Sequence, residues 1–198
     1  MQTKLYRQID QQIKRHGDLG FNFAFWIRDD DTSKTGPKLA HMLKICQGSR
    51  LLLAIIPEAV DKNLSTFVNQ YDPPPEYMHQ MNPSDRQQNM QIAVAQHGWN
   101  HQNHAPQNHK KMELGYQTPT ALRLQLLKGA TILKKIFTTR WAAGLVPPWN
   151  RIDLSIFDHW DNHPYQWISC FESQPLFNPL SKQPFDLTKT QNKTVKNN

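Results

Sequence analysis

Short apolar runs alternate with longer amphipathic stretches through most of this chain, a pattern typical of strands that alternate with helices. Leu5, Ile9 and Ile13 recur every four residues, which predicts an amphipathic helix ending at Gly17. Five later runs are short and apolar enough to be strands, and their continuity favours burial on both faces. The predicted strands cover residues 21–28, 51–56, 90–95, 142–146 and 166–171.

The segments between these runs have the apolar spacing of helices that bury one face. Thr118 followed by Pro119 predicts an N-cap with proline at the first helical position. Because strands and helices alternate, we expect an α/β fold with a parallel sheet. The predicted helices cover residues 38–46, 58–71, 119–137 and 153–160.

The remaining segments are polar and set the expected limits of the domain. Residues 73–88 form a polar loop that is longer than a compact domain usually needs, which indicates a functional or mobile segment. Residues 102–117 form another long polar loop. Residues 178–198 carry little apolar periodicity. We therefore expect one domain over residues 1–177, followed by an irregular C-terminal tail over residues 178–198.

Composition and charge narrow the classes of function. A chain of 198 residues is long enough for one domain with a sizeable core. The net charge is +7, but the lysines and arginines are scattered, so we expect no nucleic-acid partner. Cys46 and Cys170 are too few for a disulfide framework and are interpreted as free thiols. No signal peptide or membrane span is recognised, so we expect a cytoplasmic protein.

Side chains with metal-binding chemistry follow three of the predicted strands. Asp29, Asp30 and Asp31 follow the first strand, a histidine-rich stretch follows the third, and Pro147-Pro148-Trp149 follows the fourth. The carboxyl ends of parallel strands meet at one edge of the sheet, so these groups should converge. Adjacent carboxylates repel one another unless they meet a cation. A helix cap or polar turn would be the simpler explanation for one aspartate, but three exceed that need.

The histidine-rich stretch contains His97, His101 and His104. On a helical turn, residues four apart lie on one face, with about 5–6 Å between Cβ atoms. His97 and His101 could therefore share one metal ion. A solvated loop rich in histidine is the alternative for these residues taken alone. Together with the aspartates at the same predicted edge, they favour a metal site.

Taken together, these motifs resemble those of a known family. The paired aspartates, the stretch His97-Gly98-Trp99-Asn100-His101 and Pro147-Pro148-Trp149 are similar to the first three motifs of the polysaccharide deacetylase superfamily, also called NodB-homology or carbohydrate esterase 4-like. They look most like its bacterial branch of uncharacterised deacetylase-like proteins. The resemblance covers residues 21–170. It implies a distorted (β/α)7 barrel of the glycoside hydrolase/deacetylase type, which this short chain would leave incomplete.

The resemblance also implies a ligand set for one divalent metal ion, often zinc, although other transition metals suit the same ligands. His97 and His101 would be the imidazole ligands. Two adjacent aspartates would supply a catalytic base followed by the third metal ligand. We favour Asp30 as base and Asp31 as ligand, with Asp29 and Asp30 as the second choice.

Further site residues are expected from the same resemblance. The family has an arginine before its proline-aromatic pair, where this chain has Leu145-Val146, so Arg28 or Arg151 would have to replace it. A backbone N–H near Pro148 and Trp149 would stabilise the oxyanion. The residues expected around the carbohydrate are Trp99, His104, Pro148 and Trp149. For each tryptophan, packing in the core is an equally good interpretation.

The implied activity is that of a metal-dependent hydrolase that removes N-acetyl or O-acetyl groups from a carbohydrate. Such an enzyme acts on a non-peptide C–N bond when the group is N-linked. Three differences from the family favour an alternative. The arginine is replaced, and the chain ends early. The family also supplies a general-acid histidine late in the chain, whereas no histidine follows His163 here. The alternative is a catalytically inactive relative that binds a carbohydrate or a protein partner.

Overall fold

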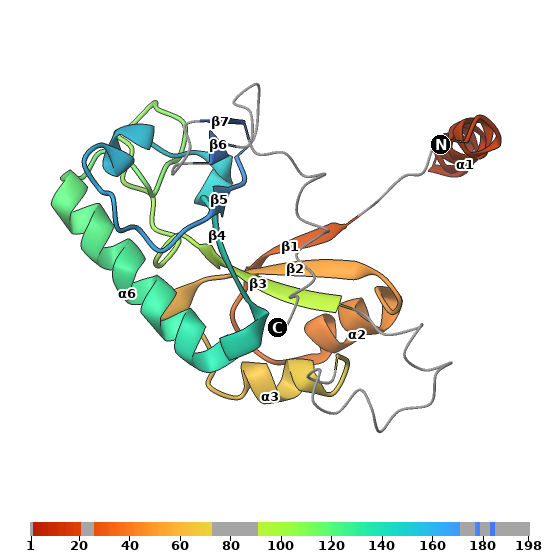
Figure 1. Ribbon diagram of the computed structural model, residues 1–198, viewed down its shortest axis with the longest axis horizontal. Coiled ribbons are helices and arrows are strands. Elements are labelled where there is room, and N and C mark those ends of the chain that lie inside the picture. The colour runs from red at the N-terminus through yellow and green to blue at the C-terminus, as the bar shows by residue number, and fades with distance from the viewer. Residues whose placement is uncertain (1, 21–25, 73–90, 171–176, 179–182, 185–198) are drawn as a thin grey trace, which may run out of the picture.

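A parallel β-sheet forms the centre of the protein. The computed structural model describes residues 2–20, 26–72, 91–170, 177–178 and 183–184. Its five strands lie in the order β1-β2-β3-β4-β5, and every neighbouring pair is parallel (Figure 1). This confirms the expected α/β class. The strands are β1 (Ile27–Thr32), β2 (Arg50–Ile55), β3 (Gln91–His97), β4 (Trp141–Val146) and β5 (Trp167–Ile168).

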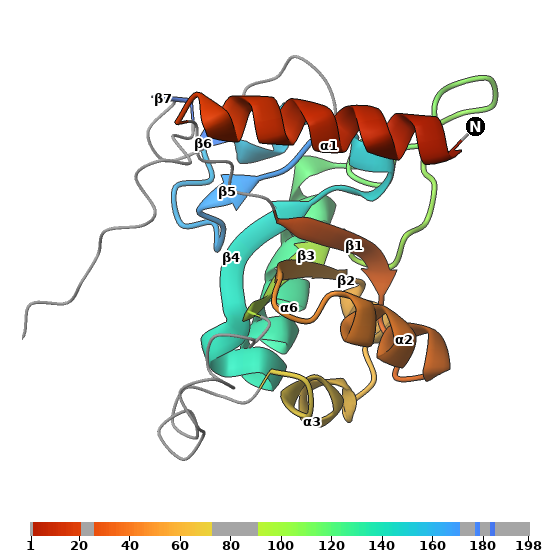
Figure 2. The ribbon, with the colours of Figure 1, turned by 90° about the vertical axis from the view of Figure 1, so that its right-hand side faces the viewer.

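Helices connect the strands and cover one face of the sheet. Alternate residues of β2 (Leu51, Leu53 and Ile55) join a core with buried side chains from three helices. Figure 2 shows the helices labelled α2, α3 and α6 beside the sheet. The intervening Leu52 and Ala54 pack on the opposite face against β3 and β4. Burial of both faces explains the continuous apolar run of this strand. The helices are α1 (Gln2–Asp18), α2 (Pro37–Ile45), α3 (Leu64–Asn69) and α6 (Pro119–Phe137).

Helix α6 follows the sequence prediction closely. The Thr118 hydroxyl accepts a hydrogen bond from the backbone N–H of Ala121, which satisfies one of the free donors of the first turn. Pro119 occupies the first turn, where its missing N–H costs nothing. The apolar face that was expected from the spacing is the buried one, and it is formed by Leu122, Leu126, Ala130, Leu133 and Phe137.

Several elements differ from the prediction. The helix expected over 58–71 is broken into a 3₁₀ turn (Pro57–Ala59) and α3, because the backbone N–H of Asp61 donates to Ser33 outside the helix. The helix expected over 153–160 is a 3₁₀ turn, Leu154–Phe157. The polar loop 73–88 lies outside the described residues. In the expected tail, β7 (Gln183–Pro184) pairs antiparallel with β6 (Phe177–Asn178).

The first strand also begins later than predicted, and this changes the setting of the aspartates. Residues 21–25 lie outside the described part of the chain, and β1 covers Ile27–Thr32. Asp29, Asp30 and Asp31 are therefore within the strand and not after it. The sequence placed the strand on the apolar run 21–28 and the aspartates after it. This followed because carboxylates are rare inside strands unless they meet polar partners.

The outer strands of the sheet approach each other through side chains. Arg28 on β1 donates a hydrogen bond of 2.8 Å to the hydroxyl of Ser169, which follows β5. In the described ranges, β1 and β5 are not neighbours in the hydrogen-bonded order. The sheet is thus an open arc, consistent with an incomplete distorted barrel. None of the described helices combines the length and apolarity that a membrane crossing requires.

Candidate metal centre

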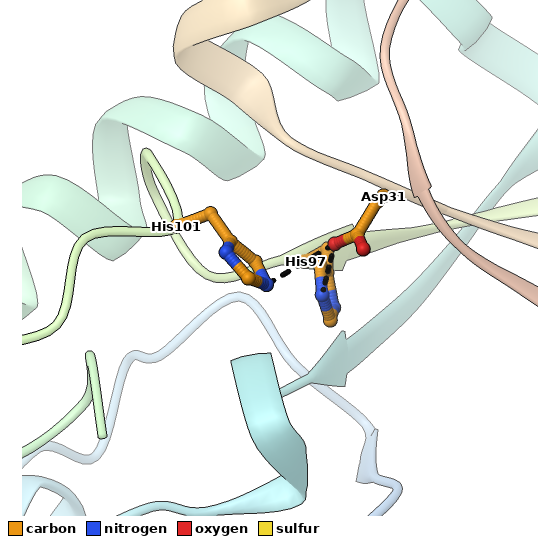
Figure 3. Close-up of side chains that lie close together, drawn as sticks. All are labelled: Asp31, His97 and His101. Atoms are coloured by element: carbon orange, nitrogen blue, oxygen red, sulfur yellow. Dashed lines mark ion pairs between the residues drawn. The ribbon is translucent and has the colours of Figure 1, made fainter. Parts of the chain in front are cut away.

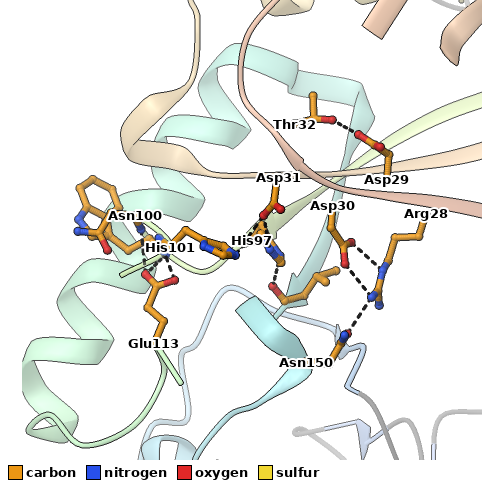
Figure 4. Close-up of polar contacts among 12 residues, drawn as sticks. Arg28, Asp29, Asp30, Asp31, Thr32, His97, Asn100, His101, Glu113 and Asn150 are labelled. Atoms are coloured by element: carbon orange, nitrogen blue, oxygen red, sulfur yellow. Dashed lines mark hydrogen bonds and ion pairs between the residues drawn. The ribbon is translucent and has the colours of Figure 1, made fainter. Parts of the chain in front are cut away.

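An irregularity in β1 separates its three consecutive carboxylates. The strand pairs with β2 up to Asp29 and resumes pairing at Thr32, with a shift of register between them. Asp31 has a φ of 69°, in the left-handed region that non-glycine residues rarely adopt. Figure 4 shows the result: Asp29 points toward Thr32, Asp30 toward Arg28, and Asp31 toward two histidines.

Asp31 meets His97 and His101 at one point (Figure 3). Its Oδ1 lies 3.0 Å from Nε2 of His97 and 3.1 Å from Nε2 of His101. The three side chains each offer one ligand atom, and these atoms lie within 4.8 Å of one another. Ligand atoms about 2.0–2.1 Å from one zinc ion lie roughly 3.3 Å apart in a tetrahedral arrangement. The observed spacing is close to that of ligands on a single ion.

The protonation of His97 indicates what this point requires. Its Nδ1 lies 2.9 Å from the carbonyl oxygen of Val146, which can only accept, so Nδ1 carries the proton. Burial of the ring lowers the pKa of His97 and favours the neutral imidazole, whose Nε2 then has a lone pair. A lone pair that faces a carboxylate oxygen is repulsive unless a cation lies between them. The donor set therefore fits a divalent metal ion with one open side.

A loop, and not the expected helical turn, brings the two histidines together. His97 is the last residue of β3, and Gly98 and His101 both have a φ of 59°. The ring centroids of His97 and His101 are nevertheless 5.3 Å apart. A Cβ atom at Gly98 would overlap the Glu113 carboxylate and the Pro148 ring. Glycine is therefore required here for both its conformation and its small size.

Glu113 lies beneath this loop and was not recognised in the sequence. Its side chain is fully buried, and it accepts hydrogen bonds from the backbone N–H groups of Trp99, Asn100 and His101 at 2.7, 2.8 and 3.1 Å. Burial raises the pKa of Glu113, and the three donors oppose that shift. A single glutamate in a polar loop gives no sequence pattern that would predict this contact.

Asp30 is held by Arg28, two residues earlier on the same side of β1. The Nε atom of Arg28 lies 2.8 Å from one oxygen of Asp30, and its Nη2 donates to the other at 2.9 Å. Arg28 also donates to Asn150 and to Ser169, each at 2.8 Å. Arg151, the other arginine considered, instead donates to the backbone carbonyl of Lys111. Asn150 was not predicted from sequence.

Asp29 faces a different environment from the other two aspartates. The Thr32 hydroxyl donates a short hydrogen bond to its carboxylate, and partial burial raises the pKa of Asp29. It is not among the residues grouped around the candidate ion in the described chain. The geometry therefore favours Asp30 and Asp31 as the acting pair.

The four residues expected around the carbohydrate occupy different positions. The ring of Trp149 is half-buried, with its centroid 4.3 Å from that of His101. Trp99 is only 7% exposed and packs inside, with Lys128 over its ring. Pro148 is buried near Gly98. His104 donates its backbone N–H to Met112 and lies outside the three-residue metal group of the described chain. Of these four residues, Trp149 is the one whose ring packs against His101, and the amino group of Lys111 lies 5.9 Å from the centroid of that ring.

No protein-family model and no curated protein matches this sequence. Three solved structures are similar to the chain. The Xyl-CE4 domain of a multidomain xylanase from the hindgut metagenome of Trinervitermes trinervoides has 12% identity and a TM-score of 0.44. A family 4 acetyl xylan esterase from Clostridium thermocellum, in complex with a cobalt ion, has 9% and 0.40. Peptidoglycan deacetylase PdaC from Bacillus subtilis has 12% and 0.42.

These likenesses cover 73%, 68% and 75% of this chain but only 57%, 55% and 58% of the three solved chains, in the same order. The chain therefore spans little more than half the length of these proteins. Two of these proteins are an acetyl xylan esterase and a peptidoglycan deacetylase. With TM-scores below 0.5, these likenesses identify neither a ligand nor a reaction, so the functional proposal depends on the side chains.

Proposed function

We propose that this protein is a metal-dependent hydrolase that removes N-acetyl or O-acetyl groups from a carbohydrate. The observation that carries the proposal is that Asp31, His97 and His101 meet at one point. Asp30, a second carboxylate, directly precedes Asp31 in the sequence. Two imidazoles and one carboxylate are a ligand set that zinc accepts, as do cobalt, nickel and iron, and zinc is the ion we propose.

Each residue has a distinct role in this proposal. His97, His101 and Asp31 hold the ion, which when bound acts as a Lewis acid and lowers the pKa of a water molecule. Asp30 accepts the proton of the attacking water and returns it to the leaving group. Arg28 orients Asp30, because its guanidinium contacts both carboxylate oxygens.

The substrate side of the site is assigned to the segment after β4. The half-buried ring of Trp149 lies beside His101 and under the amino group of Lys111, and in this proposal it contacts the sugar. A backbone N–H near Pro148 and Trp149 would stabilise the oxyanion of an acyl group, as an oxyanion hole does. Arg28 takes the place of the expected arginine, so Arg151 is left without a direct catalytic role.

A second candidate is an inactive relative that binds a carbohydrate or a protein partner. The observation that favours it is the environment of His163, the last histidine in the chain. Its ring packs against Phe157, Trp160 and Tyr165, and it is not part of the Asp31, His97 and His101 group found in the described chain. These contacts give His163 a packing role, and it does not serve as the late general acid that the family resemblance implies. The enzyme must use Asp30 for both proton transfers, or it does not turn over.

The test has two stages. Elemental analysis of the purified wild-type protein should show close to one divalent ion per chain, and His97→Ala should lose it. His41→Ala, an exposed residue on α2, should retain it and is the matched control. Release of acetate from N-acetylated and O-acetylated oligosaccharides then separates the two candidates. A wild-type protein that stays metal-free after zinc is offered would refute the hydrolase proposal.

A further inference from the structure

The loop that joins the two imidazole ligands is fixed through its backbone from several sides. The side-chain amide of Gln96 donates to the carbonyl of Gly98 at 2.8 Å. The carbonyl of Trp99 accepts the backbone N–H of Glu58 at 3.1 Å. Gln96 itself is fully buried and accepts a hydrogen bond from the hydroxyl of Tyr165. The carbonyl groups of this loop are therefore held by the surrounding core.

The amide groups of the same loop are held by one side chain. Oε1 of Glu113 accepts the N–H groups of Trp99 and Asn100, and Oε2 accepts that of His101. Three successive N–H groups that point to one spot form an anion-binding nest. Here the anion belongs to the protein and is fully buried. Glu113 thus binds the backbone N–H of His101, which is a proposed metal ligand and has a positive φ.

We propose that Glu113 is a positioning residue that pre-forms the metal centre by holding His101 in its ligating conformation. The inference depends on the metal-binding part of the proposed function but not on the hydrolytic reaction. A residue with φ near 60° loses its conformation readily unless its surroundings hold it there. The Glu113 carboxylate supplies that hold, so the ion does not have to order the loop when it binds.

The two oxygens of Glu113 make the effect of a substitution specific. In Glu113→Gln, the amide oxygen can keep the two bonds from Trp99 and Asn100 and leave its NH₂ group facing the N–H of His101. The lost hydrogen bond then falls on the ligand itself. Glu58→Gln is the matched control, because Glu58 is exposed and contacts the loop through its backbone alone. Glu58→Gln removes one negative charge near the same loop, as Glu113→Gln does.

The experiment is a titration of the metal-free protein with Co²⁺, followed by calorimetry and by the d–d absorption spectrum. Loss of a partner that orients a metal ligand typically weakens affinity about 10–100-fold. We expect a weakening of this size in Glu113→Gln, with a changed d–d spectrum, and neither effect in Glu58→Gln. Equal affinity and equal spectra for wild type and Glu113→Gln would overturn the inference while leaving the metal site itself established.

A double-mutant cycle with His101→Ala separates positioning from a general structural role. If Glu113 acts through His101, Glu113→Gln should cause little further loss of affinity once His101 is alanine. An equal loss in both backgrounds would mean that Glu113 only supports the fold, and would also overturn the inference. If Glu113→Gln fails to fold, the same cycle is made with Glu113→Asp, which keeps the charge but shortens the reach. Absence of Co²⁺ binding in the wild type would refute the proposed function instead.

Discussion

The ring of His97 donates from Nδ1 to the backbone carbonyl of Val146, 2.9 Å away. This hydrogen bond joins the last residue of β3 to the last residue of β4. It determines the tautomer, because the carbonyl can only accept, and it directs the lone pair of Nε2 toward Asp31. The parallel register of the sheet, which pairs His97 with Val146, thus prepares one ligand of the metal centre.

The assignment of the three aspartates is testable by comparing single amide variants. We expect Asp31→Asn to lose the metal, because its carboxylate faces both histidines. Asp30→Asn should keep the metal and lower the rate of acetyl release about 10²–10⁴-fold, since it removes the general base. Asp29→Asn should keep both the metal and the rate of acetyl release, because the Asp29 carboxylate contacts Thr32. Metal content and acetate release, measured on all three, check these outcomes; loss of metal in Asp30→Asn would shift the assignment by one residue.

Arg28 should matter for the rate and not for metal binding. In Arg28→Lys the flat two-point contact with Asp30 is replaced by a single ammonium, so the base is less well oriented. A misplacement of about 1 Å at a reacting group can cost roughly 100-fold, and we expect a fall of that order in kcat with little change in KM. Steady-state kinetics and metal content measure the two effects.

Arg151→Lys is the matched control for Arg28→Lys. Arg151 donates to the backbone carbonyl of Lys111, whereas Asp30 is contacted by Arg28. We therefore expect kcat within a factor of about two of wild type, as for a substitution that leaves the reacting groups in place. A large fall in kcat for Arg151→Lys together with a normal Arg28→Lys would reverse the two roles.

The sheet and the meeting of Asp31, His97 and His101 could be predicted, because strands leave a local pattern and parallel strands end at one edge. Apolar runs of strand length and the periodic face of α6 reflect burial, which the sequence records directly. The convergence of Asp31, His97 and His101 followed from the rule that the carboxyl ends of parallel strands meet. The side chains that support them are separated in sequence and carry no such periodic pattern.

The errors and omissions have a physical reason in each case. A four-residue spacing indicated a helical turn for His97 and His101, but Glu113 and Gly98 stabilise a left-handed loop instead. Glu113 accepts three hydrogen bonds from the loop after β3, and Asn150 accepts one from Arg28. These contacts join residues that are far apart in the sequence, so they depend on the folded chain and leave no local signal. Such contacts are recognised only in the folded structure.

Gly98 should be intolerant of even the smallest side chain. A Cβ atom would overlap Glu113 and Pro148, and the φ of 59° disfavours any residue that carries one. We expect Gly98→Ala to lower the free energy of unfolding by about 1–3 kcal/mol, a usual cost of local strain, and to weaken metal binding. Denaturant unfolding and metal titration check this. Gly17→Ala, where a Cβ would meet no atom within 4 Å, should show neither effect.

His163 should make the stability of the protein depend on pH. Partial burial lowers the pKa of His163 below its ordinary value of 6.5, and its Nδ1 accepts the backbone N–H of Tyr165. The unfolded chain therefore binds more protons than the folded chain just below pH 6.5. The stabilisation is complete above that pH and is lost as the pH falls through the lower pKa of the folded state.

The substitution His163→Gln isolates this contribution. Glutamine does not titrate, so the difference in thermal midpoint between wild type and His163→Gln should shrink as the pH falls from about 7.5 to 5. Other titrating groups, including His97, remain in both proteins and cancel in the difference. His41→Gln, at an exposed position on α2, is the control. A difference in midpoint that is constant across this range would show that the ring contributes by packing against Phe157 and Trp160 alone.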